Sequence, residues 1–166
     1  MDAMLYHEES IRLASIPFFE GINYILSQWA FDDLGAFVVI SSLYRIVESN
    51  LILNLFYIFV GIVTALSIFR ICKNFISTKY SFLCALTYSI SSFVLWFHAS
   101  GLKESFMVML IIVFYDYYYR YLQFKKLKYL LLAILFLSLV SLFRPALMIF
   151  CIVSIGIGIL LAKNIK

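Results

Sequence analysis

Residues 51–69 read LILNLFYIFVGIVTALSIF and contain no charged side chain. A run of this length is enough for one α-helix to cross a hydrocarbon core of about 30 Å. The whole chain has the same character, because 64% of its 166 residues are hydrophobic and 13% are charged, against about 25% charged in soluble domains. The composition therefore predicts an integral membrane protein with an all-α fold, a polytopic transmembrane helical bundle.

Further apolar segments follow this run along the chain. Membrane spans are expected at about 51–69, 80–97, 105–119, 129–143 and 145–162. A single helix over 129–162 would be about 50 Å long, which is too long for one span. Pro145 also lacks a backbone donor and disfavours helix at Arg144. The sequence therefore predicts a helical hairpin with Arg144 at its tip and about five spanning helices.

The first 50 residues differ from the rest, and we expect two regions: an outward-facing acidic segment over 1–50 with interfacial helices, and a transmembrane bundle over 51–166. Residues 34–47, LGAFVVISSLYRIV, are apolar but short and carry Arg45. Their length favours an interfacial or re-entrant helix over a full span.

The basic residues predict the orientation, since cytoplasmic loops of membrane proteins are enriched in Lys and Arg. Nine of them share one side if all five spans cross: Arg70, Lys73, Lys79, Arg120, Lys125, Lys126, Lys128, Lys163 and Lys166. The other side has four basic residues and eight of the nine acids. This distribution predicts a cytoplasmic C-terminus.

One acid, Asp116, falls on the basic side, within the tyrosine-rich stretch FYDYYYRYL at 114–122. Tyrosine is enriched where membrane meets water. Asp116 and Arg120 are four residues apart and can pair on one helix face. We interpret the stretch as an interfacial belt with a local ion pair.

The chain begins MDAMLYHEESIRLA, which is acidic where a secretory signal peptide would be basic and then apolar. Fifty outward-facing residues need a preceding span to carry them across the membrane. We therefore interpret the sequence as a fragment or truncated member of a longer protein. Its cysteines, Cys72, Cys84 and Cys151, are far apart, which argues against a zinc-type site and a disulfide framework.

Polar residues of the expected outer side form the candidate site. They are Asp2, His7, Glu8, Glu9, Asp32, Asp33, His98, Lys103, Glu104 and Arg144. Arginine and lysine can bind a lipid-linked phosphate, and a carboxylate can deprotonate an acceptor.

Each candidate also has a structural interpretation. Arg144 can extend to lipid headgroups or bind phosphate. Asp32 and Asp33 can cap a helix, act as bases or bind a divalent cation. Glu104 suits the first turn of a helix, and His98 suits an interface. Residues 2–8 are equally typical of a disordered tail.

Five short motifs occur in an order that resembles the GT-C class of integral-membrane glycosyltransferases, which includes bacterial relatives of protein mannosyltransferases and aminoarabinose transferases. The motifs are DAMLYHEES (2–10), FDDLGAFVVISSLYRI (31–46), NLFYIFVGIVTALSIFRICKNFI (54–76), HASGLKESF (98–106) and LFRPAL (142–147). The pattern that they form extends over nearly the whole chain, from residue 2 to residue 147, although family members typically have more spans.

The resemblance implies a transferase that takes sugar from a polyprenyl-phosphate donor at the outer face of a bacterial plasma membrane. Asp2 would be the base or would orient the acceptor, and Asp32 or Asp33 would assist or hold a divalent cation such as Mg²⁺ or Mn²⁺. Arg144 and Lys103 would bind the donor phosphate. His7, Glu8, His98 and Glu104 would line the cavity.

Two other readings stay open. The chain could be a remnant similar to a polysaccharide polymerase, or a small non-enzymatic membrane protein that acts as a subunit of a complex. Its partners are expected to be the lipid bilayer and the lipid-linked sugar rather than nucleic acid. The sequence does not specify the sugar, the acceptor or the oligomeric state.

Overall fold

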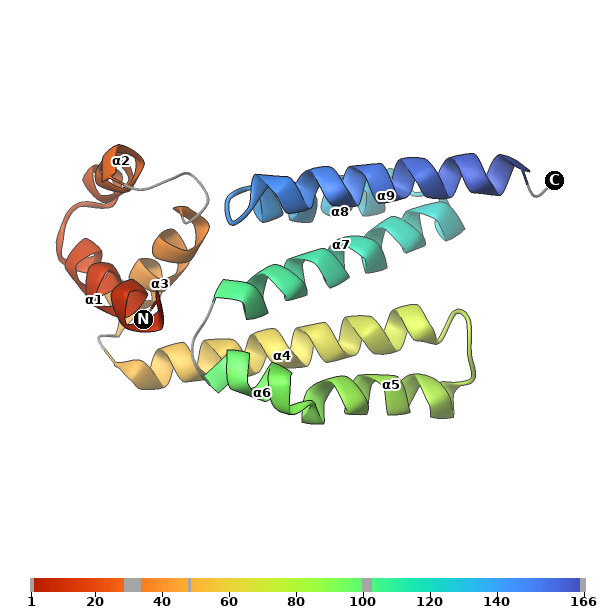
Figure 1. Cartoon of the computed structure of the whole chain (residues 1–166), viewed down its shortest axis with the longest axis horizontal. Helices are drawn as coiled ribbons and strands as arrows, with labels where there is room; N and C mark the ends of the chain where they lie inside the picture. The colour runs from red at the N-terminus through yellow and green to blue at the C-terminus, as the bar shows by residue number, and fades with distance from the viewer. Residues whose placement is uncertain (1, 29–33, 48, 100–102, 165–166) are drawn as a thin grey trace.

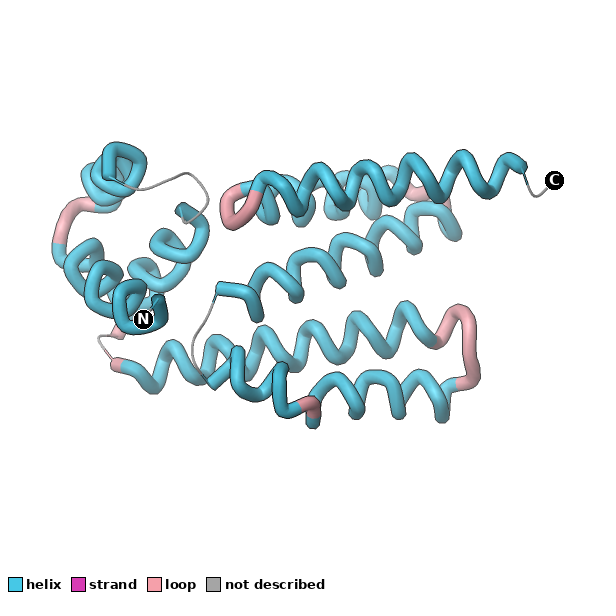
Figure 2. The backbone as a smooth tube through the Cα atoms, in the orientation of Figure 1, coloured by secondary structure: helices cyan, strands magenta, loops and turns pink. Residues whose placement is uncertain are grey.

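The computed structural model describes residues 2–28, 34–47, 49–99 and 103–164, and this part of the chain is helical without any strand. The helices are α1 (Asp2–Ser15), α2 (Phe18–Gln28), α3 (Leu34–Ile46), α4 (Asn50–Cys72), α5 (Thr78–Ile90), α6 (Ser92–Ala99), α7 (Lys103–Phe124), α8 (Leu127–Ser141) and α9 (Pro145–Asn164). The prediction of an all-α fold is confirmed (Figure 2).

The long helices form a bundle whose members alternate in direction. Helix α4 runs away from the N-terminal helices, α5 and α6 return, α7 runs out again, and α8 and α9 form a final hairpin (Figure 1). Helices α1, α2 and α3 gather at one end of this bundle, and the C-terminus lies at the opposite end (Figure 1). Because successive helices alternate in direction, the loops between them lie at two opposite ends of the bundle.

The second expected span, 80–97, is interrupted. Helix α5 ends at Ile90 and α6 begins at Ser92, because Ser91 adopts an extended conformation with φ −60° and ψ 123°. The expectation of one continuous helix there is therefore wrong. Serine disrupts helices locally, since its hydroxyl competes for backbone hydrogen bonds.

The predicted hairpin around Arg144 is confirmed. Helix α8 ends at Ser141, residues 142–144 turn the chain, and α9 starts at Pro145. Proline suits the first position of a helix, because the missing N–H has no intrahelical partner there and the ring fixes φ near the helical value. Pro145 therefore suits the start of α9.

The larger of two hydrophobic core clusters joins the N-terminal helices to the bundle. It includes Phe37 of α3, Val60 of α4, Leu110 of α7 and Phe143 of the hairpin turn, each with no more than 2% of its surface exposed. The segments 1–50 and 51–166 therefore share a core, although the sequence distinguishes them by charge.

One helix of the described part, α4, is long and apolar enough to cross a membrane. Helices α3 and α8 and residues 145–157 of α9 are apolar but shorter. Helix α7 has 22 residues, but its second half contains Asp116, Arg120 and several tyrosines, which lower its hydropathy. The structure thus shows an all-helical protein with one clear candidate span.

Candidate functional site at the N-terminal end of the bundle

The predicted site residues that the structure describes come from elements that meet at one end of the molecule. Helices α1 and α3, the start of α4, the start of α7 and the turn between α8 and α9 all lie at this end (Figure 1). His7, Glu104 and Arg144 come from three of these elements. These three polar residues, which were expected on one side of the membrane, therefore lie at one end of the bundle.

Glu104 and Arg144 form an ion pair across this end. Arg144 Nη2 lies 4.0 Å from Glu104 Oε1, with the two side chains 52% and 32% exposed. The other carboxylate oxygen, Glu104 Oε2, is buried and accepts no hydrogen bond from the described residues. A buried oxygen without a donor costs about 1–3 kcal/mol, and no contact among the described residues offsets that cost at Glu104 Oε2.

The two candidate phosphate-binding cations have different surroundings. Lys103 is 9% exposed, whereas the Arg144 side chain is half exposed at the hairpin tip. Lys103 precedes Glu104 in the sequence, yet the Glu104 carboxylate pairs with Arg144, which lies 40 positions further along the chain. Arg144 is therefore the more accessible of the two cations.

A second polar group links α1, α3 and α4. His7 Nδ1 lies 2.6 Å from the Tyr44 hydroxyl, and that hydroxyl donates to Asn50 Oδ1 at 3.4 Å. Tyr44 is 3% exposed, and its burial raises the pKa of the phenol above the usual value of 10.0. The neutral phenol therefore connects His7, a predicted cavity residue, to the first residue of α4.

Arg45 holds α3 against the end of α1. Its Nη2 donates to the carbonyl oxygen of Leu13 at 2.8 Å and also to that of Ile16. The last carbonyl groups of a helix lack intrahelical partners, so the guanidinium satisfies the C-terminus of α1. The sequence identified Arg45 only as a reason against a span, and this structural role was missed.

A backbone contact joins α3 to the hairpin tip beside Arg144. The N–H of Gly35 donates to the Leu142 carbonyl oxygen at 2.8 Å. A Cβ at Gly35 would lie 2.6–2.8 Å from ring carbons of Phe143, so only glycine allows this approach. The contact fixes the position of the Arg144 turn relative to the N-terminal helices.

Other predicted residues are placed only in part. Asp2 lies in α1 and His98 in α6, with side chains outside the described ones, and Asp32 and Asp33 lie wholly outside the described residues. Glu8 is exposed on α1. Next to it in sequence, Glu9 Oε2 and Ser10 Oγ are buried and have no hydrogen-bond partner among the described residues.

The described side chains contain no group of three or more His, Cys, Asp or Glu residues that could hold a metal ion. The expected divalent cation depends on Asp32 and Asp33, which lie outside the described residues. A carboxylate pair of this kind supplies the oxygen ligands that Mg²⁺ and Mn²⁺ prefer.

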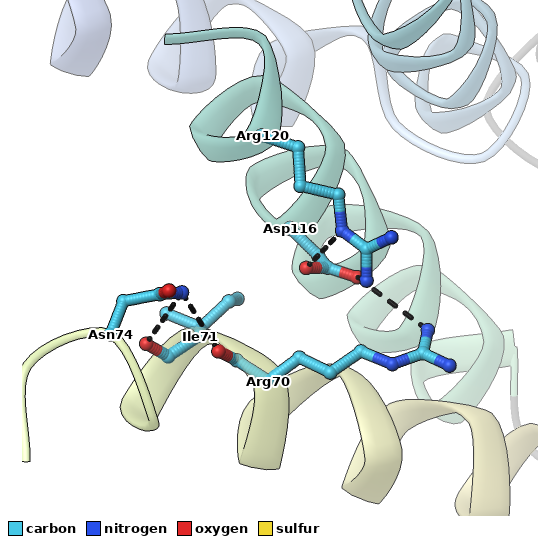
Figure 3. Close-up of polar contacts among 5 residues, drawn as sticks. All are labelled: Arg70, Ile71, Asn74, Asp116 and Arg120. Atoms are coloured by element: carbon cyan, nitrogen blue, oxygen red, sulfur yellow. Dashed lines mark hydrogen bonds and ion pairs between the residues drawn. The ribbon is translucent and has the colours of Figure 1, made fainter. Parts of the chain in front are cut away.

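The opposite end of the bundle contains a different charged group (Figure 3). The predicted pair is confirmed, because Arg120 donates to both oxygens of Asp116 at 3.1 Å. The structure adds Arg70 of α4, whose Nη1 lies 3.8 Å from Asp116 Oδ2. This third member is 46 positions from Asp116, so no local sequence pattern could indicate it.

Comparisons with protein-family models, curated proteins and solved structures found no match to this chain. The function must therefore be argued from the chemistry of the residues themselves. At the N-terminal end, that chemistry consists of an accessible guanidinium, a carboxylate with one unsatisfied oxygen and a buried Tyr44–His7 pair.

Proposed function

We propose that this chain is an integral-membrane glycosyltransferase of the GT-C type, or part of one, that transfers sugar from a polyprenyl-phosphate-linked donor for cell-surface glycan synthesis. A membrane location is supported by α4, where Leu51, Leu55, Ile58, Ile62 and Leu66 are each about half exposed or more. Their three- and four-residue spacing places them on one helix face. Such a continuous apolar surface suits lipid rather than water.

The proposed topology has about five crossings, with α5 and α6 together making the second. The N-terminal helices and the Arg144 turn face outward, and the C-terminus faces the cytoplasm. This arrangement is supported by the alternating directions of the long helices (Figure 1) and by the excess of Lys and Arg in the connections at the C-terminal end. A bacterial plasma membrane is the proposed location.

The Glu104–Arg144 pair is the observation that carries the proposed activity. The donor phosphate would bind the Arg144 guanidinium, whose planar donors match phosphate oxygens. Lys103 would contribute positive charge. Glu104, released from its ion pair, would accept a hydrogen bond from donor or acceptor hydroxyls.

In the proposed reaction, the acceptor hydroxyl oxygen attacks the anomeric carbon of the donor sugar. The bond from that carbon to the phosphate oxygen breaks, and the polyprenyl phosphate leaves with the electron pair. The hydroxyl proton passes to a carboxylate base, for which Asp2, Asp32 and Asp33 are the candidates. A divalent cation held by Asp32 and Asp33 would offset the negative charge of the leaving phosphate.

The test is transfer from a radiolabelled polyprenyl-phosphate sugar by the full chain in lipid vesicles. Arg144→Ala should reduce transfer at least tenfold, mainly by raising KM for the donor, because a charge-assisted phosphate contact contributes about 1.5–3 kcal/mol. Arg144→Lys should recover part of the loss. Asp2→Asn or Asp32→Asn should reduce kcat.

Arg12→Ala is the matched control, because Arg12 is also exposed at this end and pairs with Glu9 on the same helix at 3.8 Å. It should retain full transfer. Wild-type rates in Arg144→Ala, Asp2→Asn and Asp32→Asn together would refute the assignment of the site.

A second candidate function, a non-enzymatic subunit of a membrane complex, is favoured by one observation. An apolar groove of about 360 Å³ runs along α4, α5 and α6, lined in part by Gly61, Ala65 and Ser89. Small residues allow close packing of a neighbouring helix. Absence of transfer by the wild-type chain, combined with cross-linking of a cysteine at Ala65 to a larger membrane protein, would favour this function over the enzyme.

A further inference from the structure

The end of the bundle opposite the candidate site is strongly basic. The described residues of this end include seven cations: Arg70, Lys73, Lys79, Arg120, Lys125, Lys126 and Lys128. Asp116 is the one acid among residues 70–128 that lies near this end, since Glu104 begins α7 at the other end. This end therefore has a large surplus of positive charge.

Arg70, Asp116 and Arg120 form a cluster, called here the Asp116 cluster, which holds two of these cations at defined positions (Figure 3). Asp116 is 3% exposed, and both of its oxygens accept from Arg120. Arg70 lies farther away, at 3.8 Å, and its side chain is 51% exposed. Because one carboxylate pairs with two guanidiniums, the cluster has a net charge of one positive unit, and Arg70 is the more exposed of its two cations.

The carbonyl groups at the end of α4 oppose an anion near Arg70, and the Asn74 side chain offsets part of this effect. The Asn74 side chain donates to the carbonyl oxygens of Arg70 and Ile71, at 2.8 and 3.4 Å. These carbonyls belong to the last turn of α4 and would otherwise present partial negative charge. The amide of Asn74 thus reduces the repulsion that an anion near Arg70 would meet.

Aromatic rings surround the basic residues at this end. Phe75 contacts Tyr119, with ring centroids 5.3 Å apart, and Lys125 and Lys128 lie over the rings of Tyr121 and Tyr129 at 5.8 and 5.1 Å. Tyrosine and lysine together are typical of the headgroup region of a membrane. The cluster therefore lies where lipid phosphates would be found if α4 and α7 cross the membrane.

We propose that Arg70, which lies beside Asp116 and is flanked by Lys73 and Arg120, binds the phosphate of an anionic phospholipid headgroup. The planar guanidinium supplies the phosphate contact, and the flanking cations favour a lipid with net negative charge over a zwitterionic one. This site depends on the chain being in a membrane but not on transferase activity.

The binding experiment uses the full chain in a neutral detergent and three probes: dihexanoyl phosphatidylglycerol, dihexanoyl phosphatidylcholine and inorganic phosphate. We expect the phosphatidylglycerol to bind at least tenfold more tightly than either other probe. Arg70→Gln should weaken its binding about tenfold, and Arg70→Lys should weaken it less. Arg12→Gln, the same charge change at the other end of the bundle, should leave it unchanged.

Asp116→Asn separates this role from a purely structural one. If Arg70 only fastens α4 to α7, removing either partner of the pair should have the same effect on lipid binding. If Arg70 binds the headgroup, Asp116→Asn should strengthen phosphatidylglycerol binding, because a competing negative charge is removed, whereas Arg70→Gln weakens it. Helical circular dichroism checks that each variant is folded.

Two results would overturn the proposal. The first is unchanged phosphatidylglycerol binding in folded Arg70→Gln and Arg70→Lys. The second is equally tight binding of inorganic phosphate, which would show a site for a free anion. Wild-type sugar transfer in the Arg144, Asp2 and Asp32 variants, together with lipid binding that still depends on Arg70, would refute the transferase site and leave this one intact, so the two proposals fail separately.

Discussion

At Gly35 the N-terminal helices approach the α8–α9 hairpin closely. Its N–H bonds to Leu142, and Phe143, which is 2% exposed, packs against Phe106 with ring centroids 5.1 Å apart. Neither the backbone nor the ring has room to move away from an added methyl group. Gly35→Ala should therefore lower the free energy of unfolding by about 1–3 kcal/mol.

Gly156→Ala provides the control, because a Cβ at Gly156 would meet nothing within 4 Å. This substitution within α9 should raise stability slightly, by about 0.5–1 kcal/mol, through the better helix propensity of alanine. Thermal unfolding in detergent measures both effects. Equal stability of the two variants would contradict the close approach at Gly35.

Tyr44 should make the free energy of unfolding depend on pH in the alkaline range. Burial raises the pKa of its phenol in the folded protein, so the folded state retains the proton at pH values where the unfolded state releases it. The contribution of the Tyr44 phenol to the free energy of unfolding is therefore fully present below pH ~10, the usual tyrosine pKa. It is lost as the pH rises through the raised pKa of the folded state.

Comparison of wild type with Tyr44→Phe isolates this contribution from that of the other tyrosines. At pH 8 the variant should be less stable by about 0.5–1.5 kcal/mol, because it loses the contacts with His7 and Asn50. At pH 11 that difference should shrink. A difference that stays constant between the two pH values would show that the Tyr44 phenol does not titrate differently on unfolding.

Residue-scale prediction from sequence succeeded where the partners are close in the chain or share a charge pattern. The Asp116–Arg120 pair follows from four-residue spacing, and Arg144 was predicted at a hairpin tip because Pro145 follows it. The Glu104–Arg144 and His7–Tyr44 contacts join helices that are distant in sequence. Side-chain types alone could not indicate which of many outer polar residues would meet.

At the scale of the element, α7 is the helix around which the bundle packs, contacting both α4 and α8. Leu110 is 1% exposed in the shared core. Leu110→Ala should cost about 2–5 kcal/mol, since it removes buried atoms and leaves a cavity. The control is Leu131→Ala on α8, where the leucine is 59% exposed, and it should cost about 0.5 kcal/mol or less.

Denaturant unfolding of both variants tests this assignment of the packed and outward faces. A greater loss for Leu131→Ala than for Leu110→Ala would show that α8, rather than the centre of α7, is buried in the protein.

Element positions were predictable where proline or charge ends an apolar run. Helices α4, α8 and α9 lie within a few residues of the segments expected at 51–69, 129–143 and 145–162. Hydropathy could not reveal the break at Ser91, because a broken and a continuous helix bury similar side chains. The packing of α3 against α1 was also missed, since an apolar helix of 13 residues suits the membrane–water interface as well as a protein core.

At the scale of the whole molecule, the fold separates two kinds of charged surface. The N-terminal end contains the Glu104–Arg144 pair, and the other end contains the Arg70–Asp116–Arg120 cluster with most of the lysines. The 23 residues of α4, about 34 Å at 1.5 Å per residue, connect these ends. A membrane-spanning orientation predicts that the two ends lie in different aqueous compartments, which transfer at the outer face requires.

Labelling of single cysteines in intact cells tests this central claim most directly. Ile46→Cys and Lys126→Cys place an exposed thiol at each end, in a background in which Cys72, Cys84 and Cys151 are replaced by alanine. A membrane-impermeant maleimide added outside should label position 46 and should label position 126 only after the cells are opened. Labelling of both positions from the same side would contradict the proposed topology and, with it, an outward-facing transferase site.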